Sequence, residues 1–279
     1  MKLIGLFSNI DRCTTKNIYI ASEIAKAAGA DLIIGAGGGS VVDTAKAVAD
    51  KLSVPVVNIP TVASTNADIS AESVIYDKGG KFLKYIIYPE NPKAVIVDTH
   101  ILASAPPRFI VSGMGDALAS RFETEACVQS RSENNPGGRA CDAILEISRL
   151  CFNTLIDKGE SALEAVKNKQ VSPDVESVIE AIKFQSGVGF ESGGLAAAHA
   201  IHNGFTRKSP VKGSHGEIVA FSVIAQLFLE DRIHSLIEKV ASWCYRIGLP
   251  TTLADLSVSE KYIEAVAEAA CAPDDTMKN

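Results

Sequence analysis

Short, continuous apolar runs alternate with helical patterns through the first third of the chain. The runs "KLIGLF", "DLIIGAG", "VPVVNIP" and "AVIVD" lack the polar alternation of a half-exposed strand, which is typical of strands buried on both faces of a parallel sheet. Between them, "IYIASEIAKAAG" and "SVVDTAKAVADKL" have the period of amphipathic helices. This order predicts an α/β domain with a parallel sheet over residues 1–104.

One segment breaks this order. In "VIYDKGGKFLKYIIYP", the Lys-Gly-Gly sequence is typical of a hairpin turn between two antiparallel strands. We therefore expect a hairpin at the margin of the sheet.

After residue 104 the strand patterns end and helical periodicity takes over. Pro106 and Pro107 suit the first turn of a helix. Further helices are predicted in "CDAILEISRLCFNTLI", "VESVIEAIKFQSGVGF", "IVAFSVIAQLFLE", "IHSLIEKVASWCYRIG" and "EKYIEAVAEAAC". Residues 105–279 therefore form a predicted all-α domain.

Composition narrows the class of ligand. The net charge is -6 and no basic run is present, which argues against binding to nucleic acid or an anionic membrane surface and favours a small-molecule partner. No apolar run approaches the roughly eighteen residues of a membrane-spanning helix. The six cysteines form no Cys-x-x-Cys pair, so we expect reduced thiols in a cytoplasmic protein.

A glycine-rich loop follows the second apolar run. "LIIGAGGGSVVDTAK" places Gly35, Gly37, Gly38 and Gly39 between a predicted strand and a helix that begins near Ser40. Glycines here allow backbone N–H groups to approach a phosphate, and the positive end of the helix favours the anion, so a dinucleotide pyrophosphate is the expected ligand. The alternative is a tight turn that packs the strand on the helix.

A second loop at the same predicted sheet edge is rich in small polar groups. "NIPTVASTNADISAES" carries Thr61, Ser64, Thr65, Asn66 and Ser70 after the next strand, where open α/β sheets bind ligands. A plain Ser/Thr turn is the alternative.

Three histidines and an acid are candidate metal ligands. His199 and His202 are three residues apart on the helical "GLAAAHAIHNG", and His215 opens the next helical pattern. Asp116 lies in the apolar "VSGMGDALASRF" and supplies a carboxylate for an Asp/His/His set of the kind that binds catalytic zinc. The alternatives are histidines that only pack, and an Asp116 that caps a turn or pairs with Arg121.

Five stretches together resemble the iron-containing alcohol dehydrogenase superfamily, and specifically its glycerol dehydrogenase branch. They are "GAGGGSVVDTAKAVA", "IPTVAST", "SGMGDALASRFETEAC", "GFESGGLAAAHAIHNGFT" and "HGEIVAF". The resemblance implies a dehydroquinate-synthase-like architecture: a nucleotide-binding α/β domain, a helical domain, and a metal in the cleft between them. It also implies hydride transfer between NAD and glycerol or a related polyol, in a homo-oligomer.

The resemblance also assigns the metal ligands. Asp116, His199 and His215 match the family's ligands, and His202 becomes a neighbour of the site. The iron-binding branch has a further histidine where this chain has Ser120, which favours zinc.

By the same resemblance, the cofactor has its own set of residues. The pyrophosphate loop falls on Gly37, Gly38, Gly39, Ser40 and Val41, and the nicotinamide side on Thr61, Ser70 and Tyr76, with Ser64 counted among the cofactor-binding residues. Asn66 and His202 are the candidate catalytic residues.

Three departures from the family pattern bear on function. Asn66 stands where the branch usually has an aspartate that binds substrate, and an amide suits a carboxylate or carbonyl group better. Glu72 replaces an apolar cofactor contact. The family begins with an earlier strand–helix–strand unit that holds the adenosine and ends with a further helix, so we expect a fragment or a shortened homologue with an incomplete cofactor pocket.

Two other functions stay open at this point. One is a dehydroquinate-synthase-like lyase, whose phosphorylated substrate calls for more basic residues than Arg207, Lys208 and Lys212. The other is a truncated homologue with little or no activity.

Overall fold

The computed structural model describes residues 5–8, 10–79, 82–273 and 275–279. The chain divides into two compact units: unit 1 comprises residues 1–62 and 66–105, and unit 2 comprises residues 63–65 and 106–279. The main division falls between Ala105 and Pro106, and the short segment Ala63–Thr65 groups with unit 2.

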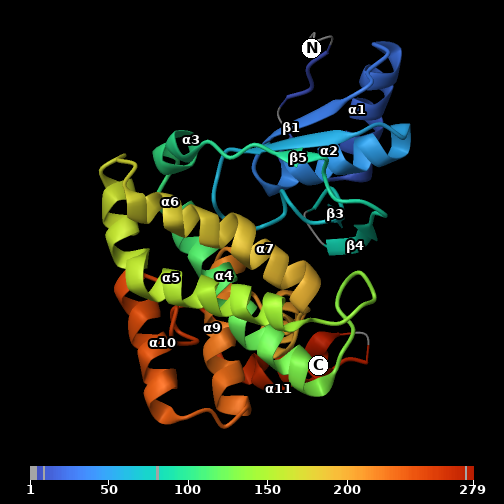
Figure 1. Ribbon diagram of the computed structural model, residues 1–279. Coiled ribbons are helices and arrows are strands. Elements are labelled where there is room, and N and C mark those ends of the chain that lie inside the picture. The colour runs from blue at the N-terminus through green and yellow to red at the C-terminus, as the bar shows by residue number, and fades with distance from the viewer. Residues whose placement is uncertain (1–4, 9, 80–81, 274) are drawn as a thin grey trace. The chain divides into compact units, whose positions relative to one another are not determined.

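Unit 1 is an α/β unit built around a parallel sheet (Figure 1). Its three-stranded sheet has the order β1-β2-β5, and both pairings are parallel. The expected parallel sheet is therefore confirmed. Its elements are α1 (Thr15–Ala27), β1 (Ile33–Gly37), α2 (Gly39–Leu52), β2 (Val56–Pro60), β3 (Glu72–Tyr76), β4 (Phe82–Ile87), β5 (Ala94–Val95) and α3 (Thr99–Ser104).

The hairpin is also present, and its strands β3 and β4 pair antiparallel with an irregularity between Ile75 and Tyr76. Part of its turn lies outside the described residues. The strand expected in "KLIGLF" falls partly on residues 1–4, which also lie outside them, and residues 5–8 form no strand.

Gly35 determines how closely α2 packs on the sheet. A Cβ atom at this position would lie 2.7 Å from both the Cβ of Ala45 on α2 and Oδ1 of Asn58 on β2. No side chain fits in that space. For Gly35, the structure therefore agrees with the tight-packing interpretation of the glycine-rich loop.

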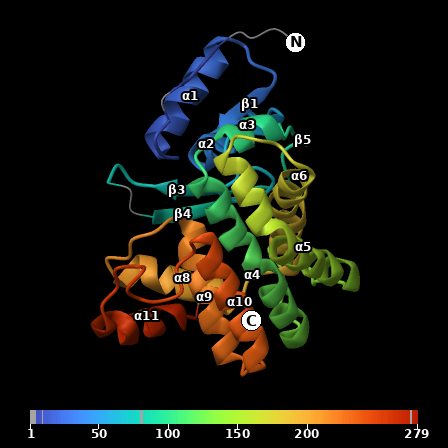
Figure 2. The same cartoon turned by 90° about the vertical axis from the view of Figure 1, so that its left-hand side faces the viewer.

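Unit 2 consists of helices in its described residues, as expected (Figures 1 and 2). The helix α4 is buried along most of its length and packs against α5 and α9, and α8 packs against α9 and α11. The elements are α4 (Arg108–Ser130), α5 (Asp142–Lys167), α6 (Pro173–Glu180), η1 (Ala181–Gln185), α7 (Ser186–Val188), η2 (Gly189–Gly193), α8 (Ala197–Lys208), α9 (His215–Leu229), α10 (His234–Ile247), η3 (Glu260–Tyr262), α11 (Ile263–Ala270) and η4 (Thr276–Lys278).

The helix expected over residues 175–190 is not regular. Two π-helical segments, η1 and η2, interrupt it where its backbone approaches α4. A Cβ atom at Gly189 would lie 2.0 Å from Oγ of Ser120, and one at Gly193 would lie 2.2 Å from Oγ1 of Thr124. Such π-helical turns are frequent at functional sites.

No described helix has both the length and the apolar character needed to cross a bilayer. All six cysteines carry free thiols, and four of them are buried: Cys13, Cys127, Cys151 and Cys244.

Candidate functional site

Two glycines bring α4 and α9 into direct backbone contact in unit 2. A Cβ atom at Gly115 would lie 2.4 Å from the carbonyl oxygen of Gly216, and one at Gly216 would lie 1.7 Å from that of Ser112. Asp116 and His215 are the immediate neighbours of these glycines. The contact therefore places the His215 imidazole beside the Asp116 carboxylate, with Nε2 at 3.1 Å from Oδ1.

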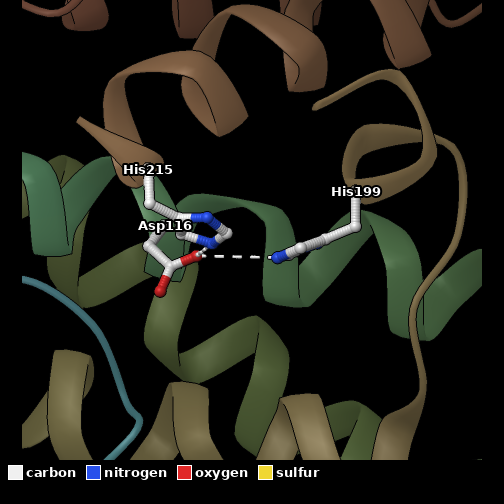
Figure 3. A group of neighbouring side chains, drawn as sticks. All are labelled: Asp116, His199 and His215. Atoms are coloured by element: carbon white, nitrogen blue, oxygen red, sulfur yellow. Dashed lines mark ion pairs between the residues drawn. The ribbon is translucent and has the colours of Figure 1, made fainter. Parts of the chain in front are cut away.

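His199 on α8 completes a group of three potential metal ligands (Figure 3). Each of Asp116, His199 and His215 offers one ligand atom, and these atoms all lie within 4.8 Å of one another. The distance from Nε2 of His199 to Oδ1 of Asp116 is 3.6 Å. The structure thus brings together the three ligands expected from the sequence.

The chemistry of this group fits a zinc ion. The Asp116 carboxylate is only 7% exposed and can only accept hydrogen bonds, so it needs a positively charged partner, which protonated His199 supplies without a metal and a bound metal ion would supply in its place. Burial alone would raise the pKa of Asp116, but His215 and His199 outweigh burial and hold this pKa below its ordinary value. Atoms bound to one tetrahedral zinc at about 2.1 Å lie roughly 3.4 Å apart, close to the 3.6 and 3.1 Å between Oδ1 of Asp116 and Nε2 of His199 and His215.

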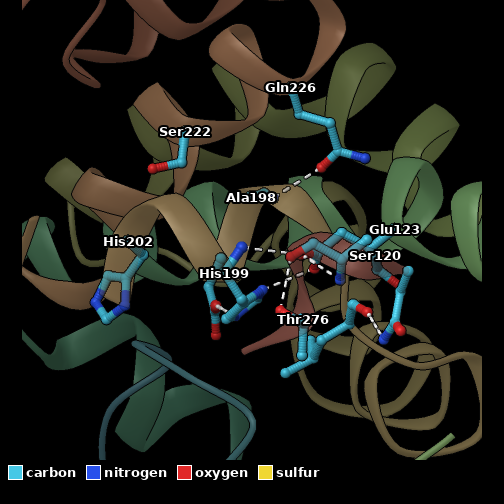
Figure 4. Close-up of polar contacts among 12 residues, drawn as sticks. Ser120, Glu123, Ala198, His199, His202, Ser222, Gln226 and Thr276 are labelled. Atoms are coloured by element: carbon cyan, nitrogen blue, oxygen red, sulfur yellow. Dashed lines mark hydrogen bonds and ion pairs between the residues drawn. The ribbon is translucent and has the colours of Figure 1, made fainter. Parts of the chain in front are cut away.

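Glu123 orients His199. Its Oε2 lies 2.7 Å from Nδ1 of His199, and its Oε1 accepts hydrogen bonds of 2.9 Å from the backbone N–H groups of His199 and Ala196 (Figure 4). Since a carboxylate only accepts, Nδ1 of His199 carries the proton and Nε2 is left to bind a metal. Glu123 is not among the residues predicted from the sequence, although it follows Asp116 by seven residues and so lies on the same helix face.

Glu123 also sets the charge of His199 in the metal-free protein. Burial alone would lower the pKa of His199, but the carboxylates of Glu123 and Asp116 raise it to about 10. At neutral pH His199 is therefore protonated on both ring nitrogens, and a metal ion must displace the proton on Nε2.

Side chains from other helices cap the N-terminus of α8. Its N-cap residue, Ala196, has no side chain that accepts a hydrogen bond, so Glu123 takes that role from α4. The backbone N–H of Ala198 donates to Oε1 of Gln226 on α9 at 3.0 Å (Figure 4). Hydrogen bonds from α4 and α9 thus fix the first turn of α8, the helix that carries His199.

His202 lies behind His215 and outside the ligand group. Its Nε2 is 3.0 Å from Nδ1 of His215, and its Nδ1 is 3.2 Å from Oδ1 of Asn203. Burial lowers the pKa of His202 well below its ordinary value, and the neighbouring His215 and His199 lower it further. His202 is therefore a neutral partner of a ligand.

The alternative partner of Asp116, Arg121, is directed elsewhere. Nε of Arg121 pairs with Glu125 at 3.2 Å. Ser120, at the position of the fourth ligand in the iron-binding branch, donates to Oγ of Ser148 at 3.4 Å, and Gly189 packs against it. The space around Ser120 is filled, so Ser120 does not join the group of Asp116, His199 and His215.

His215 begins α9 as expected, and a local motif fixes that start. Ser214 and Glu217 form a capping box, in which each side chain accepts from the other residue's backbone N–H.

In unit 1, the glycine-rich loop joins β1 to α2. Gly38 is the N-cap, and the backbone N–H groups of Gly39 and Ser40 have no hydrogen-bond partner among the described residues. A Cβ atom at Gly37 would lie 2.6 Å from the Cβ of Val41, so the turn itself requires glycine there. Two such N–H groups at the positive end of a helix suit an anion.

The remaining predicted cofactor residues are divided between the units. Thr61 follows β2 and donates its backbone N–H to Gly37 O at 3.0 Å, and Tyr76 ends β3. Asn66 also belongs to unit 1, whereas Ser64 belongs to unit 2, where its carbonyl accepts from Ser112 Oγ at 3.4 Å.

Lys46 of α2 anchors the loop that contains Ser70. Its Nζ donates to the carbonyl oxygens of Ala67 at 2.6 Å, Ser70 at 3.2 Å and Glu72. Asp43 pairs with the same ammonium at 3.0 Å, and both side chains are buried. The Ser70 hydroxyl is buried and accepts a hydrogen bond from Nζ of Lys46, so Ser70 stabilises the conformation of the loop.

This chain is similar to known glycerol dehydrogenases in both sequence and structure. A family model described as iron-containing alcohol dehydrogenase matches residues 4–99. The chain is 50% identical over 253 residues to a glycerol dehydrogenase of Thermotoga maritima, covering 89% of this chain and 70% of the relative. It is 47% identical to a glycerol dehydrogenase of Escherichia coli, covering 96% and 74%. A crystal structure of a probable glycerol dehydrogenase from Sinorhizobium meliloti superposes with a TM-score of 0.90 at 40% identity, covering 96% and 76%.

Replacing Glu123 with glutamine tests its orienting role. The glutamine oxygen can still cap α8, but its NH₂ group then faces Nδ1 of His199 and favours the tautomer with the proton on Nε2. We expect the Glu123→Gln variant to fold and to bind zinc about 10–100-fold more weakly, measured by competition with a chelating dye. Glu125→Gln removes a neighbouring buried carboxylate of α4 and should leave zinc affinity unchanged. Equal affinities in the two variants would contradict the role of Glu123.

Zinc binding should release protons. With a pKa of about 10 against an ordinary 6.5, protonated His199 stabilises the metal-free fold fully below about pH 6.5, and this contribution is lost as pH rises through 10. At pH 8, zinc must therefore displace at least one proton, and apparent zinc affinity should rise about tenfold per pH unit and per displaced proton between pH 7 and 9. Calorimetry in two buffers of different ionisation enthalpy measures the release. Zinc binding without it would show that His199 is neutral or not a ligand.

Proposed function

The chain belongs to the iron-containing alcohol dehydrogenase family, in its glycerol dehydrogenase branch, and from this premise we propose a zinc-dependent oxidoreductase that transfers a hydride between NAD(H) and glycerol or a related polyol. The observation that carries the proposal is the convergence of Asp116, His199 and His215. A cytoplasmic homo-oligomer is part of the same proposal, and the free cysteines are compatible with that location.

The proposal gives each ligand a supporting residue. Asp116, His199 and His215 hold the zinc, Glu123 orients His199, and His202 accepts a hydrogen bond from His215. Zinc is favoured over iron because Ser120 occupies the position of a fourth ligand. When bound, zinc supplies a Lewis acid for the substrate hydroxyl, and NAD supplies the hydride acceptor.

The cofactor is assigned to unit 1 by the same reasoning. The free N–H groups of Gly39 and Ser40, with Gly37, Gly38 and Val41 shaping the turn, suit the pyrophosphate. The nicotinamide side is assigned to Thr61, Ser64, Ser70 and Tyr76, of which Ser64 lies in unit 2. Lys46 supports the assignment because it holds the loop around Ser70 in one conformation.

Substrate selection is assigned to Asn66, whereas His202, the other candidate catalytic residue, has both ring nitrogens engaged and acts on the site through His215. A vicinal diol offers two hydroxyl groups, and the Asn66 amide can donate to one group and accept from another. A charged substrate group such as a carboxylate is also compatible with Asn66, which lacks the negative charge of aspartate.

A lyase that acts on a phosphorylated substrate is not favoured. Of the three basic residues near the site motifs, Arg207 is paired with Asp275 at 2.9 Å and is not free for a phosphate. The similar proteins named above are glycerol dehydrogenases.

The direct test combines metal analysis with activity. The purified protein should hold about one zinc per chain and should reduce NAD with glycerol or a related diol. A chelator should abolish activity and zinc should restore it, while Asp116→Asn should lose both zinc and activity without loss of helical content.

Calorimetric titration with NAD checks the cofactor site separately. Absence of zinc uptake would reject the proposal; zinc without NAD binding would favour a homologue with little or no activity, and phosphate release from a dehydroquinate synthase substrate would favour the lyase.

Replacing Asn66 with aspartate, the residue usual in the glycerol dehydrogenase branch, tests its role in substrate choice. An aspartate accepts hydrogen bonds from hydroxyls more strongly than an amide and repels a carboxylate. We expect Asn66→Asp to raise kcat/KM for glycerol, relative to that for a 2-hydroxy acid of the same length, by about tenfold. Asn66→Ala, which removes both hydrogen-bonding groups, should lower both values. An unchanged ratio in Asn66→Asp would remove Asn66 from the substrate site.

A further inference from the structure

A buried carboxylate near the end of the chain fixes the side chain of Asn203. Asp275 is 4% exposed, and its two oxygens lie 3.2 and 3.3 Å from Nδ2 of Asn203. A carboxylate only accepts, so the amide nitrogen of Asn203 must face it. Arg207 also donates to Oδ2 of this carboxylate, at 2.9 Å. The Asn203 amide therefore has one orientation, with its oxygen toward Nδ1 of His202 at 3.2 Å.

This orientation determines the proton positions on two imidazoles in turn. Because Oδ1 of Asn203 only accepts, Nδ1 of His202 carries the proton and its Nε2 has a lone pair. Nδ1 of His215 lies 3.0 Å from that Nε2 and must donate to it. The other ring nitrogen of His215 is Nε2, which lies 3.1 Å from Oδ1 of Asp116 and becomes available to a metal once the proton between these two atoms is displaced.

The segment that carries Asp275 is itself held against α8. Oγ1 of Thr276 donates to the carbonyl of Ala196 at 2.8 Å, and Nδ2 of Asn279 donates to that of Leu195 at 2.8 Å. Figure 4 shows Thr276 close to the first turn of α8, which carries His199. These two contacts are independent of the chain of hydrogen bonds that leads to His215.

We propose that Asp275 and Asn203 are positioning residues that set the tautomer of His202 and keep a proton on Nδ1 of His215, so that Nε2 is the nitrogen of His215 available to a metal in the ligand group. The expected effect on zinc affinity rests on the zinc site proposed above. Asp275 acts on His215 as Glu123 acts on His199: an acceptor-only carboxylate behind the ring decides which nitrogen is free. The difference is that Asp275 acts through two intervening side chains.

The test replaces Asp275 with asparagine, which is nearly isosteric. Its amide nitrogen can donate to Oδ1 of Asn203, so the Asn203 amide is free to turn over and present its nitrogen to His202. Long-range ¹H–¹⁵N correlation spectra of metal-free, ¹⁵N-histidine-labelled protein report the tautomer of each ring. We expect His202 to shift from the Nδ1–H form toward the Nε2–H form in Asp275→Asn, and zinc affinity to fall about tenfold, as for other outer partners of metal ligands.

Two further variants separate tautomer control from simple packing. Thr276→Val removes a neighbouring hydrogen bond of the same segment and should change neither the tautomer nor zinc affinity. The double variant Asn203→Asp/Asp275→Asn again places an acceptor-only group against His202 and should restore the wild-type spectrum. A wild-type His202 tautomer in Asp275→Asn, or equal zinc affinities in Asp275→Asn and Thr276→Val, would overturn the proposal. If the wild-type chain binds no zinc, the zinc site itself is rejected, whereas the metal-free spectra still decide whether Asp275 sets the tautomers.

Discussion

The candidate metal centre depends on one steric constraint, the contact between the backbones of α4 and α9 at Gly115 and Gly216. Any Cβ atom at these positions would lie 2.4 Å or less from a carbonyl oxygen, so a larger residue would push the helices apart. Asp116 and His215 follow and precede these glycines directly, so their ligand atoms would separate with the helices. The close packing of α4 and α9 thus determines the distance between Asp116 and His215.

Once the helices are in contact, buried acceptor groups decide how each imidazole is used. Glu123 lies behind His199, and the Asn203 oxygen, held by Asp275, lies behind His202 and through it His215. Each engages the proton on the ring nitrogen that faces away from Asp116, so Nε2 of His199 and of His215 is the nitrogen from which a metal displaces a proton. In a buried site such hydrogen bonds are stronger than in water, and unpaired groups are costly, so the arrangement favours a single set of proton positions.

The helix α2 combines two functions in unit 1. Its first turn presents the N–H groups of Gly39 and Ser40, which suit an anion. Two turns later, Lys46 fixes the loop after β2 by donating to two of its carbonyl oxygens and to that of Glu72 at the start of β3. The Asp43–Lys46 pair is buried, so the ammonium that holds the loop is itself paired. One helix therefore organises both loops to which we assign the cofactor.

The sequence alone determined the features that depend on near neighbours. Apolar runs predicted the parallel strands, helical periodicity predicted unit 2, and the motifs nominated Asp116, His199 and His215, because such patterns reflect the period of each element and short spacings. Only the tertiary structure decided what lies behind the ligands. Glu123 and His199 are 76 residues apart in the chain, and Asn203 and Asp275 are 72 apart. Hydrogen bonds at such separations arise from how helices pack, and the π-helical turns near Ser120 likewise follow from close contact with α4; neither has a local pattern that predicts it.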